Sequence, residues 1–397
     1  MSTGSFLPKF APHTARRKRF AVLCAAAALP LALASCTDNA KAGATDGPIQ
    51  VVSTDSKCTV SAGTAPSGNL TFAVKNDGAQ VTEFYLLGAD GLQIVGEVEN
   101  IGPGLTRNLV VTAGSGKYTT ACKPGMQGDG IKAPFEITDS GTQPAVDADF
   151  QKLLDTGTQQ YASYVKDQTE QLVTGTQAFA AAYAAGDLDK ARSLYAATRV
   201  HWERIEPVAE SFGDLDPKLD AREADLEPGQ EWTGWHRAEK DLYPPAGYTA
   251  LTAAERSTLA TQLVTDTADL AQRTRTVELS ADNLGNGAKE LLDEIATGKV
   301  TGEEEAWSHT DLWDFQANVD GARIAFESLK PALQQKNPEL ASTLETKFAA
   351  LEAELKTYAK GDGFVYYNDL TQEQIQRLAS LVDALGEPLS QLTAAVL

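Results

Sequence analysis

The sequence predicts a multidomain protein with an N-terminal β-sandwich followed by an all-α helical bundle domain. The first part carries short runs of β-branched and aromatic residues, such as 70–74 and 81–87, between turns rich in Gly, Asn and Pro. From residue 145 onward Ala, Leu, Glu, Gln and Lys dominate, and apolar residues recur at three- and four-residue spacing. Short strands at such intervals are typical of a sandwich, and long helices with short connections are typical of a bundle.

The first 35 residues predict a lipoprotein signal peptide. A basic stretch at Arg16–Arg19 precedes an apolar stretch at 20–34 that is shorter than the roughly 20 residues of a membrane-spanning helix. It ends in Leu-Ala-Ser before Cys36, which resembles a bacterial lipobox. We therefore expect export and a lipid on Cys36 that anchors the protein to the outer face of the cell membrane. An ordinary cleaved signal is the alternative, and the Arg16-Arg17 pair leaves the general and the twin-arginine export routes open.

The boundaries of the remaining segments follow from the changes in composition. We predict a polar tether at 36–48, the sandwich at 49–139, a linker at 140–145 and the helical domain at 146–397. In the helical domain, Asp187 and Thr252 are suitable N-caps, and Glu255 completes a capping box with Thr252. We expect helices at 150–185, 187–212, 252–284, 288–297, 311–333, 339–359 and 372–396.

The charge balance excludes one class of partner. The chain has 34 Lys and Arg against 54 Asp and Glu, a formal net charge of −20. Nucleic-acid binding depends on a basic face, so we expect no nucleic acid as a partner. The acidic surface attracts cations instead, although acidity by itself keeps a protein soluble and does not make a binding site.

Two cysteines, Cys58 and Cys122, remain within the predicted sandwich. Outside the cytoplasm the environment is oxidising, so we favour a disulfide between them, which would stabilise the domain by about 4 kcal/mol. The alternative is a pair of thiolate metal ligands.

Two pairs of residues in the helical domain have the spacing of metal ligands. Glu203 and Glu206 are three residues apart, as are His236 and Glu239, so the members of each pair share one helix face. Two neighbouring carboxylates repel each other unless a proton or a cation lies between them. In helical bundles such pairs from facing helices build metal sites, whereas exposed glutamate pairs usually form a solvated face.

Four longer stretches of the helical part resemble the imelysin-type domain of EfeO-type bacterial iron uptake proteins. The resemblance covers residues 146–397 and includes the HxxE motif of that family, here His236 and Glu239. Full-length members of the family place a cupredoxin-like domain before the helical one, which agrees with the predicted sandwich. The stretches are 201–220, 231–243, 302–322 and 363–367.

The resemblance implies an extracytoplasmic component that binds ferrous or ferric iron and works with a membrane permease and a haem peroxidase-like protein. Carboxylates with at most one imidazole suit iron or manganese and tolerate calcium or zinc. Glu303 is an alternative to Glu304 in the Gly-Glu-Glu run. The ligand set that the resemblance implies is His236, Glu239, Glu203, Glu206, Asp220 and Glu304.

The sandwich departs from a blue-copper protein. Such a site needs two histidines and a cysteine with a weak axial methionine. Cys122 and Met126 have a suitable spacing, but the sandwich contains no histidine, so we do not expect type 1 copper. Cys58, Glu83 and Cys122 could form an altered metal site; the simpler interpretation is a disulfide and a surface acid.

A metallopeptidase is the alternative function, because imelysin-type domains have been grouped with peptidases. The H-E-x-x-H pattern is absent, and Arg237 follows His236 where a general base would stand. The sequence also offers no arrangement of Ser, His and Asp or of Cys and His for nucleophilic catalysis. We therefore expect a metal-binding transport component and not an enzyme.

Overall fold

The structure is a computed structural model that describes residues 47–397, except 90, 92, 93, 127, 129, 142–146, 227 and 228. All the described residues belong to one compact unit. The predicted signal peptide, the expected lipid acceptor Cys36 and most of the predicted tether and linker lie outside the described residues. Within the described part of the chain, no helix combines the length and the apolar character that crossing a membrane requires.

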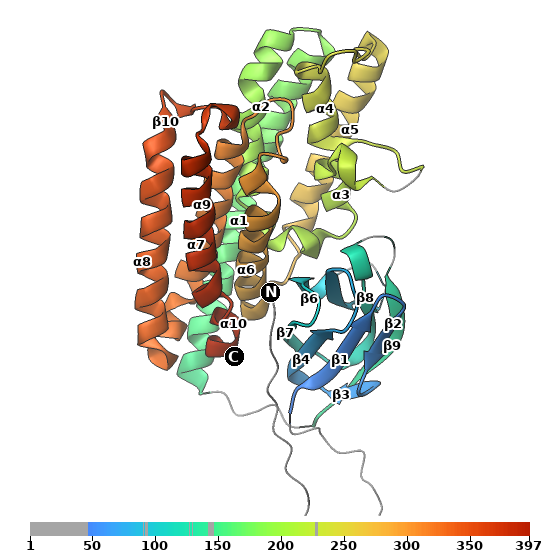
Figure 1. Cartoon of the computed structure of the whole chain (residues 1–397), viewed down its shortest axis with the longest axis vertical. Coiled ribbons are helices and arrows are strands. Elements are labelled where there is room, and N and C mark those ends of the chain that lie inside the picture. Colours follow the sequence, from blue (N-terminus) through green and yellow to red (C-terminus); the bar gives the residue numbers. More distant parts are fainter. Residues whose placement is uncertain are drawn as a thin grey trace, which may run out of the picture. The chain divides into compact units, whose positions relative to one another are not determined.

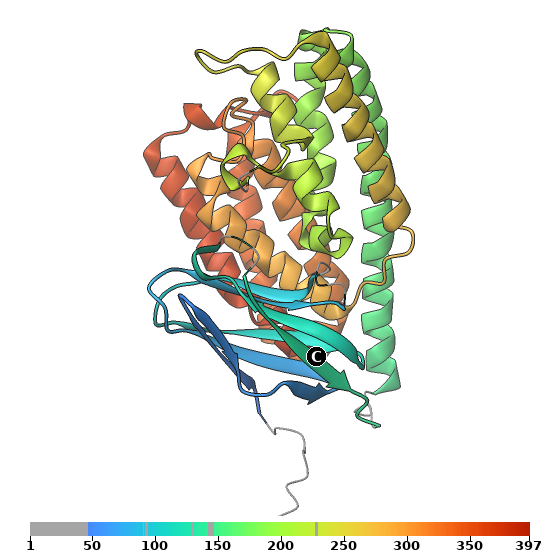
Figure 2. The same cartoon turned by 90° about the vertical axis from the view of Figure 1, so that its right-hand side faces the viewer.

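The predicted fold class is confirmed: nine strands are followed by a helical domain (Figure 1). The strands form two sheets, one in the order β2-β1-β4-β7 and the other in the order β3-β9-β8-β5-β6 (Figure 2). The rings of Phe84 and Phe135 lie 5.2 Å and 5.6 Å from that of Phe72 in the core between the sheets. The strands are β1 (Ile49–Thr54), β2 (Lys57–Val60), β3 (Thr64–Pro66), β4 (Gly68–Asn76), β5 (Thr82–Leu87), β6 (Ile94–Ile101), β7 (Thr106–Ala113), β8 (Gly116–Cys122) and β9 (Ile131–Thr138).

Strands β5 and β6 have an apolar face and an acidic face. Phe84 pairs with Val98 across the two strands, and both side chains belong to the core of the sandwich. Because successive side chains of a strand point to opposite faces, the neighbouring Glu83, Glu97 and Glu99 lie on the other face. That face is not solvent-exposed as an ordinary polar face would be, because Glu83 and Glu97 are both buried.

Ten helices follow in the described part of the chain, most of them with an identifiable start signal. Asp187 accepts a hydrogen bond from the backbone N–H of Lys190, and Thr252 forms the predicted capping box with Glu255. The longest helix, α1, packs against α2, α5 and α7. The helices are α1 (Ala148–Ala184), α2 (Leu188–Glu203), α3 (Leu215–Asp220), α4 (Gly234–Leu242), α5 (Ala253–Arg273), α6 (Ala281–Thr297), α7 (Asp311–Lys336), α8 (Pro338–Leu355), α9 (Gln372–Leu389) and α10 (Leu392–Val396).

Several of the expected helix ranges are wrong. The helix expected at 288–297 begins at Ala281, the one expected at 339–359 ends at Leu355, and the one expected at 372–396 is interrupted after Leu389. The helix expected at 187–212 ends at Glu203, and a 3-10 segment, η2 (Glu206–Phe212), replaces its last turns. Pro207 explains the change, because its ring clashes with the carbonyl four residues earlier in a continuous α-helix. The helix expected at 252–284 stops at Arg273, and α6 starts anew at Ala281, where Ser280 and Asn283 form a second capping box.

Helix α6 is held between η2 and the sandwich. The Cα of Gly287 lies so close to η2 that a Cβ there would be 1.7 Å from the backbone oxygen of Pro207. On the sandwich side, the Asn286 amide donates to the Val110 oxygen at 2.8 Å, and the Thr112 N–H donates to Asp282 at 2.8 Å. Arg107 adds an ion pair with Asp293 at 2.8 Å.

We predict that Gly287→Ala lowers the free energy of unfolding by about 2 kcal/mol, because α6 must move away from η2 to make room for the methyl group. Gly386→Ala is a matched control, since that helical glycine has no atom within 4 Å of an added Cβ. Higher helix propensity should make this control more stable by about 0.5–1 kcal/mol. Urea denaturation measures both values, and a Gly287→Ala protein as stable as the wild type would contradict the tight contact.

Candidate metal centre

Helix α4 carries the HxxE pair into the interior of the helical domain. The helix starts at Gly234, which has a φ of +85° and approaches α3 so closely that a Cβ would lie 2.3 Å from the Leu219 oxygen. Only glycine fits this conformation and this contact without strain. The contact brings Asp220, at the end of α3, beside α4. Trp235 is fully buried against Phe179 of α1 and fixes the rotation of α4.

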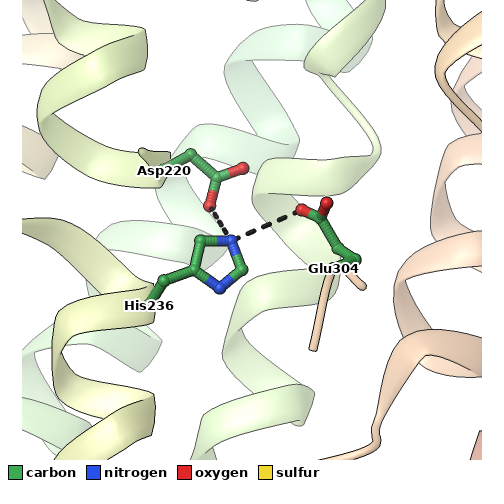
Figure 3. A group of neighbouring side chains, drawn as sticks. All are labelled: Asp220, His236 and Glu304. Atoms are coloured by element: carbon green, nitrogen blue, oxygen red, sulfur yellow. Dashed lines mark ion pairs between the residues drawn. The ribbon is translucent and has the colours of Figure 1, made fainter. Parts of the chain in front are cut away.

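His236 lies between two sets of carboxylates. Its Nε2 atom is 3.4 Å from Asp220 Oδ1 and 3.4 Å from Glu304 Oε1, and these three side chains come from separate segments (Figure 3). On the other side of the ring, Nδ1 is 3.4 Å from Glu239 Oε2 and 3.9 Å from Glu305 Oε1. In each of the two groups, one atom from every residue lies within 4.8 Å of the others, so either group could hold a metal ion.

Neighbouring donors fix the orientation of these carboxylates. Glu239 Oε1 accepts hydrogen bonds from the backbone N–H groups of Trp307 at 2.8 Å and Ser308 at 2.7 Å, which turns Oε2 toward His236. The Glu305 carboxylate accepts from the hydroxyls of Ser308 and Tyr195. Asp220 Oδ2 accepts from the indole N–H of Trp202 at 2.8 Å. Such supporting contacts hold metal ligands in position before the ion arrives.

Two buried bases share the interior with these acids. Arg199 is fully buried and donates to Asp220, to Glu203 and, at 3.3 Å, to Glu304. Lys299 lies 3.0 Å from Glu203 Oε2 and 2.8 Å from Glu206 Oε2. The predicted pair Glu203 and Glu206 therefore faces the centre but is already bound to a guanidinium and an ammonium group.

The acids outnumber the bases. Six carboxyl groups are buried around His236, and two more are partly buried, against the two buried bases just described and the partly exposed Arg222, which lies 3.5 Å from Glu304 Oε2. Charges of one sign cannot all persist in a low-dielectric interior without compensation. The buried six are Glu203, Glu239, Glu304, Glu305, Asp311 and Asp314, and the partly buried two are Glu206 and Asp220.

The pKa directions reflect this imbalance. Burial raises the pKa of Asp311 to about 7, and burial followed by the charge of Glu239 raises the pKa of Glu305 well above its usual range. For His236, burial and Arg199 favour the neutral ring, but the contacts with Glu239, Glu304 and Asp220 prevail and raise its pKa to about 10. Bound protons and the imidazolium ring thus offset negative charge that a metal cation would neutralise in their place.

Several buried polar atoms lack the hydrogen bonds that burial normally requires. Among the described residues, His236 Nε2, Asp311 Oδ2 and both carboxylate oxygens of Asp314 have no hydrogen-bond partner. Buried polar groups without partners cost roughly 1–3 kcal/mol each, and native proteins keep few of them. These atoms fit a site that completes its bonding with a cation.

A cavity of about 730 Å³ leads to one side of the centre. Asp220 and Glu304 line it, together with Glu206 and Lys299, whereas Glu239 and Glu305 do not. An ion from solvent would therefore reach the Nε2 side of His236 first.

The structure brings the predicted ligands together and leaves the alternative Glu303, as well as His201, outside the centre. His236, Glu239, Asp220 and Glu304 converge, whereas the alternative Glu303 is exposed. His201 lies apart and bonds Gln168 through Nδ1 at 2.8 Å. Sequence reasoning missed Glu305, Asp314, Arg199 and Lys299. The adjacency of Glu305 to Glu304, and the four-residue spacing of Arg199 and Glu203, were the available signals.

The sandwich offers no thiolate ligand. Cys58 and Cys122 form a disulfide. The interpretation of Glu83 as a surface acid is wrong, because its side chain is only 3% exposed and accepts a hydrogen bond from the Tyr85 hydroxyl at 2.5 Å. The error arose because the outer face of β5 is covered instead of solvated.

Comparisons with known proteins agree with this division of the chain. A family model for imelysin matches residues 157–392, and one for the cupredoxin-like domain matches residues 23–134. The chain is 37% identical over 370 residues to the iron uptake system component EfeO of Escherichia coli (strain K12), which covers 92% of this chain and 96% of the relative. The EfeO proteins of Shigella flexneri and Shigella sonnei (strain Ss046) match to the same extent.

We predict that Arg199→Met destabilises the metal-free protein by about 3–5 kcal/mol at neutral pH, because it leaves buried carboxylates without their counter-ion. Methionine keeps most of the side-chain volume, so loss of charge dominates. Arg275→Met is the control, since Arg275 is exposed and bonds only the Gln272 side chain within the described structure. Urea denaturation in chelator measures both, and equal stability of the two variants would show that Arg199 is not a needed counter-ion.

Proposed function

Since this chain belongs to the EfeO family of iron uptake system components, we propose that its helical domain captures an iron ion outside the cytoplasm through His236 and the surrounding carboxylates. The observation that carries the proposal is the convergence of one imidazole with Asp220, Glu239, Glu304 and Glu305 in an interior that has too few bases to balance its acids. The ion is cargo and not a resident cofactor.

The donor set suits iron. Carboxylate oxygens and a single imidazole are hard to intermediate donors, which bind ferrous, ferric and manganous ions well and thiophilic ions poorly. Ligands held at roughly 2.1 Å from an ion lie about 3 Å from one another in an octahedral arrangement. Nε2 of His236 is 3.4 Å from each of its two carboxylate neighbours, so only small shifts would be needed to close around an ion.

We propose different roles for the two sides of the imidazole. Nε2, Asp220 and Glu304 meet the ion first, because this side faces the cavity and Nε2 has no hydrogen-bond partner in the described structure. Glu239 accepts the Nδ1 proton and orients the ring, and with Glu305 it provides further oxygen ligands. Glu203 and Glu206 join the ligand set when Lys299 and Arg199 give way.

The remaining parts of the proposal concern transport. The lipid on Cys36 keeps the protein at the outer face of the membrane, where it delivers iron to a permease with the help of a haem peroxidase-like protein. The relatives' name, iron uptake system component, supports a role beside other components.

Peptidase activity is the less favoured alternative. In metallopeptidases of the H-E-x-x-H type, a glutamate beside the histidine ligand acts as general base. Here Arg237 occupies that position, and its guanidinium packs 5.2 Å from the Trp232 ring and donates to the Tyr248 hydroxyl at 3.1 Å. This arginine therefore takes the place of the glutamate but cannot act as the general base that a peptidase requires.

We predict that the purified protein binds iron and that His236→Ala with Glu239→Ala weakens binding by about a hundredfold or more, because an imidazole and its orienting carboxylate are both lost. Anaerobic equilibrium dialysis against ferrous iron, followed by elemental analysis, measures the affinity. His201→Ala is the matched control, because that histidine lies in the same domain but contacts Gln168. Iron binding that is equal in the double variant and in the control would remove His236 from the site. Chelator-sensitive peptide hydrolysis that His236→Ala abolishes would favour the enzyme instead.

A further inference from the structure

A second group of acids, one buried and two partly buried, lies away from the His236 centre. Glu97 comes from the acidic face of β6, Glu210 from η2 and Glu290 from α6. One carboxylate oxygen of each lies within 4.8 Å of the others. Three segments that are far apart in the sequence therefore bring a carboxyl group to the same point.

The backbone holds these carboxyl groups together. The close approach of Gly287 to Pro207 fixes α6 against η2, one turn before Glu290 and three residues before Glu210. Asn286 and Asp282 of α6 bond to the backbone of β7, and α6 also packs against β6, which carries Glu97. The proximity of the three carboxyl groups is thus imposed by the fold.

No base forms an ion pair with this cluster in the described part of the chain, although the nearby charge of Lys289 lowers the pKa of Glu290. None of the ion pairs among the described residues includes Glu97, Glu210 or Glu290. Glu97 is 2% exposed, and its Oε2 atom has no hydrogen-bond partner among those residues. Burial, followed by the charge of Glu210, raises the pKa of both Glu97 and Glu290 well above the usual range. Carboxyl groups held together in this way lower stability unless a proton or a cation lies between them, and Glu97 and Glu210 hydrogen-bond to each other in the absence of a cation.

The cluster and the His236 centre open to different cavities. Glu97 and Glu290 line a cavity of about 550 Å³, together with Arg107 and Lys289. Asp220 and Glu304 line the cavity of about 730 Å³ described above. A cation can therefore reach the two places independently.

We infer that Glu97, Glu210 and Glu290 form a second cation site, distinct from the His236 centre, that takes a hard divalent ion such as Mn²⁺ or Fe²⁺. All three donors are carboxylate oxygens, and neither imidazole nor thiolate is present to favour zinc or copper. Because its ligands come from both the sandwich and the helical domain, a bound ion would also tie β6 to α6 and η2. Glu99, Glu206 and Glu294 line the cavity of the His236 centre and are absent from the lining of the cavity at Glu97 and Glu290.

The test counts bound Mn²⁺ on the full chain. Free aqueous Mn²⁺ gives a sharp paramagnetic resonance signal that disappears on binding, so titration yields both number and affinity. We expect about two ions per wild-type chain. Glu97→Gln with Glu290→Gln should remove one, His236→Ala with Glu239→Ala should remove the other, and all four changes together should remove both. Glu170→Gln is the control, because Glu170 is exposed on α1.

Two measurements, the melting temperature and the number of bound Mn²⁺ ions, distinguish three outcomes. These are the absence of a second site, misfolding of the variant, and the absence of an iron site at His236. Glutamine has nearly the shape of glutamate but no charge, so the Glu97→Gln, Glu290→Gln protein should melt at a higher temperature than wild type in chelator. It should also lose part of the rise in melting temperature that Mn²⁺ causes in wild type. Two bound ions in this variant, or a single wild-type ion that disappears with His236→Ala and Glu239→Ala, would overturn the second site and leave the His236 centre standing. Loss of one bound ion in the Glu97→Gln, Glu290→Gln protein would support the second site, whether or not the His236 variants lose an ion.

Discussion

The buried guanidinium of Arg199 is the interaction on which the arrangement of the helical domain depends. It lies within ion-pair distance of acids from α2, from the end of α3, from the 302–310 connection and from α7. A buried charge is tolerated only where partners surround it, so these four segments must meet. Lys299 repeats the pattern with Glu203 and Glu206. The two bases assemble more acids than they can balance, and the surplus makes the interior receptive to a metal cation.

Glycine contacts set the distances at which these segments meet. Gly234 lets α4 touch the backbone of α3, which places His236 beside Asp220, and Gly321 of α7 has a similar contact with the backbone of Arg204. A side chain at either position would separate the segments by more than a ligand site tolerates, because interiors are close-packed and transmit such displacements. The chemistry of the centre is thus coupled to packing between backbones several residues away.

The sandwich has kept the architecture of a cupredoxin-like domain without the donors of a copper site. Its two cysteines are joined to each other, and its sequence holds no histidine. The chemically distinctive feature is instead the acidic outer face of β5 and β6, where α6 and η2 pack against β6. Burial of acidic side chains on a strand face costs free energy unless a proton or a cation offsets their charge.

The sequence by itself determined the fold class, the capping signals at Asp187 and Thr252, and the HxxE pair, because each depends on residues only a few positions apart. Helical periodicity places His236 and Glu239 on one face whatever surrounds them. The sequence could not show that Glu203 and Glu206 are already paired with Lys299, that Glu305 belongs to the centre, or that Glu83 and Glu97 are buried. Those facts depend on which distant segments come into contact. Only the tertiary structure sets the burial and the counter-ions of a carboxylate, and these determine whether it is a surface charge, half of an ion pair or a ligand.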